Sequence, residues 1–158
     1  MDTSVLEAIR ALLREHGAEF REVHHAPTRT SQEAAAARGE PIEIGGKAIV
    51  AKVDAEFKLF VFSAARRLRS RAICKHFGAT RFRFATKEEL YELTGLVPGC
   101  VPPFGRPVLP LNLHVDTSIL ESDRIAFNAG SLTDSIIMSR ERYVEIAAPS
   151  ETFPFSKR

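Results

Sequence analysis

The sequence predicts a mixed α/β protein in which helices surround a curved, barrel-like sheet of mostly antiparallel or mixed strands. Two observations lead to this prediction. Segments with the apolar period of amphipathic helices alternate along the chain with short runs rich in β-branched and aromatic residues. Glycine, proline and capping residues separate these segments, and we find no linker, internal repeat or low-complexity block. A chain of 158 residues is therefore expected to form a single domain, residues 1–158.

The first third of the chain predicts two helices with a strand between them. Residues 4–16 carry apolar side chains on one face, begin with an S-x-x-E capping box and end at Gly17. The segment EFREVHH, residues 19–25, alternates like a short strand. A second helix is expected over residues 30–39, where a T-x-x-E box starts the segment and Gly39 stops it.

The middle of the chain predicts a hairpin, two helices and an edge strand. KAIVAKV (47–53) and FKLFVFS (57–63) form two central strands joined by a tight turn. A basic helix should follow over residues 65–77. RFRFA (81–85) alternates like a strand, and TKEELYELTG (86–95) has the capping box and terminal glycine of a short helix.

Three further strands and one helix are expected in the last third. The strands are LPLNLHVD (109–116), RIAFNAG (124–130) and DSIIMS (134–139), and the helix lies around RERYVEI (140–146). The prolines of the last segment, residues 149–158, indicate an irregular C-terminal tail.

Composition narrows the functional classes. The apolar fraction of 44% and charged fraction of 27% are those of a soluble globular protein, and no apolar run approaches the roughly 20 residues of a membrane span. The N-terminus is acidic and amphipathic, unlike a secretory signal, so a cytoplasmic location is expected. Cys74 and Cys100 form no CxxC pair, and we expect both to be thiols.

The distribution of charge is uneven. Residues 59–86 contain seven Lys and Arg side chains and no acidic residue, which leaves about −5 on the remainder of a chain of net charge +2. Arg67, Arg71 and Lys75 follow one another at four-residue spacing along the predicted basic helix. Such a row can contact a polyanion or can be a solvated helix face, and we recognise no aromatic base-stacking motif within it.

The common catalytic and cofactor motifs are missing from the sequence. The histidines show no HxH, HxxxH or HExxH spacing, so we expect no metal site. There is no GxSxG elbow, P-loop or GxGxxG motif, and therefore no indication of a nucleotide cofactor. Cys100 lies in a suggestive loop without an identifiable partner, which favours a packed thiol over a nucleophile.

The loop TGLVPGCVPPFG, residues 94–105, is unusually rich in glycine and proline. Its spacing from Gly95 through Gly99 and Pro103 to Gly105 forms the pattern GxxxGxxxPxG. Glycine lets backbone groups approach a ligand closely, and proline limits the alternative conformations of the loop before binding.

Lys47 and the FNAG turn are ambiguous when taken alone. Lys47 follows two glycines at the start of a strand, where its ammonium could hold a phosphate or a carbonyl, or could simply be solvated. Asn128 and Gly130 end a later strand and, without other information, form a turn.

The glycine loop together with GGKAIVAKV, HAPTRTSQEAAAARG and IAFNAGSLTDSIIMSRERYVEI resembles the YbaK/ProX family of aminoacyl-tRNA deacylases, relatives of the editing insertion domain of bacterial prolyl-tRNA synthetase. The resemblance implies the fold of that domain and trans-editing, the hydrolysis of the ester that joins a wrong amino acid to tRNA. It also implies that Lys47 anchors the 3′ end and that the backbone around Gly95, Gly99 and Gly105 surrounds the ester and the attacking water.

The same resemblance implies a substrate-binding set and a branch of the family. Thr30 matches a threonine that lines the amino-acid pocket, and Pro103 and Gly130 complete the set with Asn128. Asn128 lies where members that remove alanine carry a histidine, and IAFNAG followed by DSIIMS is more similar to the branch that acts on seryl- and threonyl-tRNAs.

Two functional hypotheses follow. The first is an aminoacyl-tRNA hydrolase in which Arg67, Arg71 and Lys75 contact acceptor-stem phosphates. The second is a non-catalytic module that recruits tRNA or an aminoacyl-tRNA synthetase through the same surface and leaves the ester intact. Neither needs a metal, a cofactor or a membrane.

Overall fold

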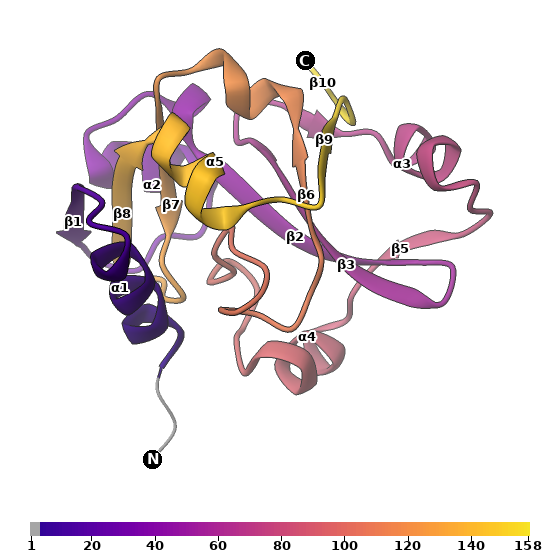
Figure 1. Ribbon diagram of the computed structural model, residues 1–158, viewed down its shortest axis with the longest axis horizontal. Coiled ribbons are helices and arrows are strands. Elements are labelled where there is room, and N and C mark those ends of the chain that lie inside the picture. The colour runs from indigo at the N-terminus through magenta and orange to yellow at the C-terminus, as the bar shows by residue number, and fades with distance from the viewer. Residues whose placement is uncertain (1–3) are drawn as a thin grey trace.

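The computed structural model describes residues 4–158, and Figure 1 shows how its helices and strands are arranged. Five α-helices, two short 3-10 helices and ten strands occur in this part of the chain. Their order is α1 (Val5–Glu15), β1 (Phe20–His24), α2 (Ser31–Arg38), η1 (Ile42–Ile44), β2 (Gly46–Val53), β3 (Glu56–Ser63), β4 (Arg67–Leu68), α3 (Ser70–Phe77), β5 (Phe82–Phe84), α4 (Lys87–Thr94), β6 (Leu113–Asp116), η2 (Thr117–Glu121), β7 (Arg124–Asn128), β8 (Asp134–Ser139), α5 (Arg140–Ala147), β9 (Glu151–Phe153) and β10 (Ser156–Lys157).

The strands form three sheets. The largest has the order β5-β2-β3-β6-β9, the second has the order β1-β8-β7, and β10 pairs with β4. The β2–β3 pairing is antiparallel, whereas β6 runs parallel to both β3 and β9. The prediction of a mixed sheet is therefore confirmed. Within the described residues each sheet is open, so the barrel-like shape is not confirmed.

The β2–β3 hairpin crosses the centre of the molecule (Figure 1). Its two-residue turn places Asp54 at φ 53°, in the left-handed region that such turns require and that Asp tolerates. The Asp54 carboxylate accepts the backbone N–H groups of Thr80 and Arg81 at 3.1 and 2.9 Å. These bonds fasten the turn to the segment that leads into β5.

Both faces of the hairpin are buried, as predicted for central strands. Val50 and Leu59 belong to the core cluster between the two larger sheets. Phe60 and Phe62, on the opposite face, pack with Phe155 near the C-terminus. Burying each of these side chains contributes about 1.5–3 kcal/mol to stability, which explains the apolar content of both strands.

Local capping signals in the sequence predict the helix starts well. Complete capping boxes join Thr30 to Glu33 in α2 and Thr86 to Glu89 in α4. At α1 the Ser4 hydroxyl accepts the N–H three residues on, at 3.1 Å. No helix among residues 4–158 combines the length and apolar character needed to cross a bilayer.

The basic helix is shorter than predicted. It begins at Ser70, and Arg67 lies instead in strand β4 opposite Lys157 of β10. The N–H of Arg69 donates to the carbonyl of Phe155 at 2.7 Å, which keeps this segment extended. Arg67, Arg71 and Lys75 therefore do not form one helical row, because only the last two share a helix.

The C-terminal segment 149–158 contains two short strands, which differs from the expected irregular tail. Strand β9 joins the largest sheet through β6, and β10 pairs with β4. Buried Asp116 accepts hydrogen bonds from the Phe155 N–H at 2.5 Å and from the Ser156 hydroxyl at 2.6 Å. A buried carboxylate requires such donors, and here the C-terminal segment supplies them.

One predicted strand is also shorter in the structure. Residues 109–112 of LPLNLHVD lie outside it, and β6 starts only at Leu113. Leu109 and Leu111 are buried in the core without being part of a strand. Their alternation with Pro110 and Asn112 therefore reflects packing of an irregular segment rather than sheet pairing.

Candidate functional site

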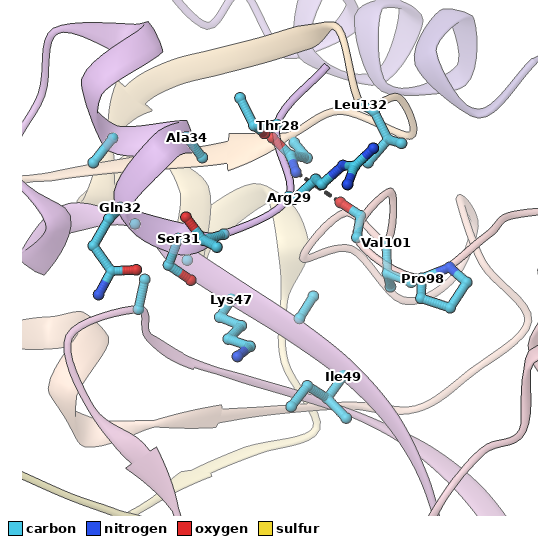
Figure 2. Close-up of a pocket in the computed structure, with 18 of the residues that line it drawn as sticks. Thr28, Arg29, Ser31, Gln32, Ala34, Lys47, Ile49, Pro98, Val101 and Leu132 are labelled. Atoms are coloured by element: carbon cyan, nitrogen blue, oxygen red, sulfur yellow. Dashed lines mark hydrogen bonds between the residues drawn. The ribbon is translucent and has the colours of Figure 1, made fainter.

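A cavity of about 960 Å³ opens beside the first half of β2. Its walls come from α2 and the turn before it, from Gly45–Val50, from the end of β5 and from the glycine- and proline-rich loop (Figure 2). Four of the predicted site residues line it, namely Thr30, Lys47, Gly99 and Asn128. The fold thus brings together residues that are almost 100 positions apart in the chain.

The cavity exists because β2 has an uncovered edge. Strand β5 pairs only with Ala51–Val53, and the Ala85 N–H then donates to the Val50 carbonyl at 3.0 Å before the chain turns into α4. Toward the start of β2, no further strand of residues 4–158 pairs with this edge, and only an isolated bridge joins Gly45, before β2, to Ala126. Because backbone groups alternate between the two edges of a strand, those of Ala48 face the same edge as the Val50 carbonyl and border the cavity.

Lys47 lies on this exposed stretch of β2, opposite Phe62 of β3. Its side chain is exposed, and among residues 4–158 no carboxylate lies within ion-pair distance of its ammonium. In Figure 2 the lysine lies between Ser31 of α2 and Ile49 of β2. Its three donors are therefore available to a ligand in the cavity.

Thr30 is the N-cap of α2. Its hydroxyl oxygen accepts the N–H of Glu33 at 3.0 Å, and the Glu33 carboxylate accepts the N–H of Thr30 in return. This cap fixes the position of Thr30 at the cavity wall, and its hydroxyl hydrogen remains able to donate to a ligand. Ser31 and Gln32, in the first turn of α2, line the cavity beside it.

A hydrogen-bond network anchors the glycine loop to the body of the protein. Asn128 donates through Nδ2 to the carbonyl of Gly99 at 2.7 Å, and its Oδ1 accepts from Arg38 at 2.9 Å. Arg38 also donates through Nε to the Ser135 hydroxyl at 2.9 Å. Gly99 has φ 92°, a conformation that glycine adopts without strain. The network therefore holds a left-handed turn of the loop against the cavity.

Arg38 is a functional candidate that the sequence did not reveal. It ends an alanine-rich helix just before a glycine, where an arginine is usually solvated, yet in the structure it is buried. Burial lowers the pKa of Arg38 to about 10, so the side chain remains charged at neutral pH. None of its hydrogen-bond partners in residues 4–158 is a carboxylate. The cavity wall thus carries a fixed, uncompensated positive charge.

The cavity lining as a whole is cationic. It includes Arg29, Arg38 and Lys47, whereas none of the described residues that line it is Asp, Glu, His or Cys. Such a site attracts an anionic or strongly polar ligand, and it offers no conventional side-chain base, thiol or metal ligand.

Comparison with known proteins identifies the family. The family model of the aminoacyl-tRNA editing domain matches residues 25–146. The chain belongs to the aminoacyl-tRNA editing domain family.

Individual relatives agree with this assignment. The chain is 36% identical over 145 residues to the Multifunctional Ser/Thr-tRNA deacylase ProXp-y of Escherichia coli K12, covering 88% of this chain and 86% of the relative. The crystal structure of the hypothetical protein APE2540 matches with a TM-score of 0.83 at 25% identity, over 94% of this chain and 99% of that one. A protein provisionally described as a trans-editing enzyme for prolyl tRNA synthetase matches with a TM-score of 0.84 at 24% identity over 100% of both chains, which shows the shared fold.

Four other predicted site residues do not line the cavity of this editing domain. Gly95 ends α4 in the left-handed region at φ 73°. Pro103 is buried, and its carbonyl accepts the hydroxyl of buried Tyr143 at 2.6 Å. A Cβ on Gly105 would lie 2.5 Å from the Leu111 carbonyl, and one on Gly130 would lie 2.8 Å from Val5. These residues shape and pack the loop and the FNAG turn, rather than facing the cavity.

The remaining candidates also lie outside the cavity lining. Arg67, Arg71 and Lys75 are exposed on β4 and α3. Cys100 is buried, and burial raises the pKa of its thiol, as expected for a packed side chain.

Proposed function

We propose that this protein is a trans-editing deacylase that hydrolyses the ester of mischarged tRNA, with seryl- and threonyl-tRNA as its substrates. The observation that carries the proposal is the 36% identity of this chain, over most of both chains, to a Ser/Thr-tRNA deacylase. The cationic cavity supports it, because its lining includes four of the residues that the family resemblance singles out, namely Thr30, Lys47, Gly99 and Asn128. Mischarged tRNA forms during translation, so we propose that the protein acts in the cytoplasm.

The cavity chemistry supports a mechanism without a protein nucleophile. An ester is already activated, so water attack needs mainly orientation and stabilisation of the charge that develops on the carbonyl oxygen. Water adds to the carbonyl carbon, the bond to the ribose oxygen breaks, and the departing oxygen takes up a proton released by the water. The products are the free amino acid and tRNA with its terminal hydroxyl restored.

We assign distinct roles to the residues of the cavity. Lys47, unpaired and exposed, holds the 3′-terminal nucleotide as a compact cation. The loop around Gly99, fixed by Asn128, supplies backbone groups close to the ester. Thr30 can donate its hydroxyl hydrogen to the side-chain oxygen of serine or threonine, a contact that favours these amino acids over alanine.

The function is tested by incubating the purified protein with tRNAs charged with serine, threonine, alanine and proline and following loss of each ester over time. We expect release of serine and threonine above the spontaneous rate, and slower release of alanine. An ester that stays intact across the whole panel would contradict the proposal.

A recruiting module for tRNA or for an aminoacyl-tRNA synthetase is the second candidate, because the exposed Arg67, Arg71 and Lys75 lie outside the cavity and could bind a partner independently of hydrolysis. It predicts a stable complex in which the ester survives. Charge reversal at these three positions should weaken salt-dependent tRNA binding without altering the cavity. Survival of the ester in the charged-tRNA panel then distinguishes the module from a hydrolase.

A further inference from the structure

An exposed aromatic side chain lies at the rim of the cavity. Phe84, the last residue of edge strand β5, is 56% exposed and lines the cavity. Its ring makes a T-shaped contact with that of Phe82, with ring centroids 5.6 Å apart and planes at 80°. The other large apolar residues that are exposed in residues 4–158, Tyr91, Val97 and Leu120, are not part of the cavity lining. The exposure of Phe84 thus coincides with the entrance to the site.

Strand β5 also connects the cavity to a second depression. This depression has a volume of about 500 Å³. Three basic residues line it, together with one acidic residue, Asp54, and the uncharged Thr80 and Phe82; the basic residues are Lys52, Arg81 and Arg83. Arginine and phenylalanine alternate from Arg81 to Phe84, a stretch of about 10 Å at the rise of an extended strand. Because successive side chains of a strand point to opposite faces, Arg81 and Arg83 share the face of Lys52, and Phe84 lies on the other face. A ligand that wraps around this free edge would therefore meet cationic groups on one face and an aromatic ring on the other, next to the cavity.

The charge of this edge is only partly neutralised. Arg83 forms a forked pair with Glu89, at 2.7 and 2.9 Å. The Asp54 carboxylate is occupied by backbone and hydroxyl donors of the segment before β5. Lys52 and Arg81 form no ion pair within the described residues, and the Lys52 ammonium lies 5.5 Å from the ring centre of Phe57. Two cations therefore remain available for phosphate groups.

We propose that the unpaired 3′-terminal nucleotides of tRNA lie along β5, with a base stacked on Phe84 and phosphates beside Lys52 and Arg81. Stacking on an aromatic side chain and charge along the backbone are how proteins bind unpaired nucleic acid without reading sequence. The esterified ribose then enters the cavity next to Phe84, where Lys47 is located. This inference rests on the proposed function, because the cavity has to receive the aminoacyl end.

Binding can be measured without hydrolysis, because the protein contains no tryptophan. The substitution Phe84→Trp creates a single fluorescent reporter, which is titrated with an uncharged oligoribonucleotide that ends in CCA. We expect strong quenching with a midpoint that rises with salt, since stacking quenches the indole and the phosphates release counterions. The matched control is Tyr91→Trp, which replaces an exposed aromatic residue outside the cavity lining and should be quenched far less.

Steady-state kinetics with charged tRNA provide a second test of the role of Phe84. Phe84→Ala should raise KM about tenfold or more and leave kcat close to its original value, and Phe84→Tyr should restore KM because it keeps the ring. Equal quenching of the two tryptophan variants, or an unchanged KM for Phe84→Ala in an active enzyme, would overturn the inference and leave the deacylase function intact. If the original protein released no amino acid, the deacylase function would fail, and the titration would still decide whether β5 binds RNA.

Discussion

The hydrogen bonds of Asn128 serve different parts of the site. Its carbonyl oxygen accepts from buried Arg38 and from the Ser135 hydroxyl, and its amide nitrogen donates to the Gly99 carbonyl in the glycine loop. The bond from Arg38 satisfies a buried cation, and the bond to Gly99 fixes a backbone segment at the cavity. One side chain therefore couples the rigid β7–β8 region to the loop.

The bonds of Asn128 to Arg38 and to Gly99 can be separated by mutation. Asn128→Asp keeps an acceptor for Arg38 but has no donor for Gly99, whereas Asn128→Ala removes both. We expect both variants to lose about tenfold in kcat/KM for seryl-tRNA, because both release the loop, and only Asn128→Ala to lose thermal stability as well. Melting curves and single-turnover rates check this. An Asn128→Asp enzyme with full activity would show that the loop needs no anchor.

The resemblance to the deacylase family, which short stretches of sequence carry, predicted the cavity residues Lys47, Thr30, Gly99 and Asn128. Local context alone left Lys47 and Asn128 ambiguous. Arg38 and Phe84 do not stand out. Arg38 is buried because β7 and β8, which carry its partners Asn128 and Ser135, pack over the end of α2. Phe84 is exposed because β5 is the edge strand of its sheet.

At the scale of elements, the site depends on where strands stop. The uncovered edge of β2 arises because β5 is three residues long, and the loop that faces this edge follows directly from the glycine at the end of α4. The glycines of the loop have different roles. Gly99 lines the cavity, whereas position 105 has to be glycine because the Leu111 carbonyl lies too close to leave room for a Cβ.

Two glycine substitutions test this distinction. Gly105→Ala would place a Cβ 2.5 Å from a backbone oxygen and should cost about 3 kcal/mol of unfolding free energy, because backbone atoms cannot move aside cheaply. Gly95→Ala has open space around the new Cβ but keeps a positive φ, and it should cost about 1 kcal/mol. Urea unfolding of both variants compares them directly. Equal costs would contradict the packing role of Gly105.

Elements whose signals lie within a few residues were predicted correctly, and elements that depend on distant partners were not. The capping boxes of α2 and α4 each span four residues and are present as expected. Strand β4 exists only because it pairs with β10, almost 90 residues later, and the same pairing converts the expected tail into ordered structure. No local pattern could have revealed that partner, and the basic helix was therefore predicted too long.

At the scale of the whole molecule, the core contains a histidine that links stability to pH. His114 lies in β6, is 3% exposed and stacks on Phe60 with ring centroids 5.4 Å apart. Burial lowers the pKa of His114 to about 4, and nearby Lys58 acts in the same direction while Glu151 opposes it. Because β6 joins β3 to β9, protonation of this ring would affect the largest sheet.

The sign of the pH dependence follows from this depressed pKa. The unfolded chain binds a proton at His114 below about pH 6.5, whereas the folded protein does so only near pH 4. The unfolding free energy should therefore fall by up to about 3 kcal/mol as the pH is lowered from 6.5 to 4. Chemical unfolding of the original protein and of His114→Phe at several pH values isolates this contribution. The difference between the two should change steadily between pH 6.5 and 4, and a constant difference would contradict the buried, neutral histidine.

The central claim is that the cavity beside β2 is where the aminoacyl ester is hydrolysed. Its most direct test is single-turnover release of serine from seryl-tRNA by the original protein, by Lys47→Ala and by the control Lys157→Ala, with melting curves for all three. Lys47 is exposed, so its removal should leave the fold intact and lower the rate about 10- to 100-fold, as expected for the loss of a charge-assisted contact. Lys157, an exposed lysine outside the cavity lining, should be replaceable without such a loss. Full activity of a correctly folded Lys47→Ala protein would contradict the claim.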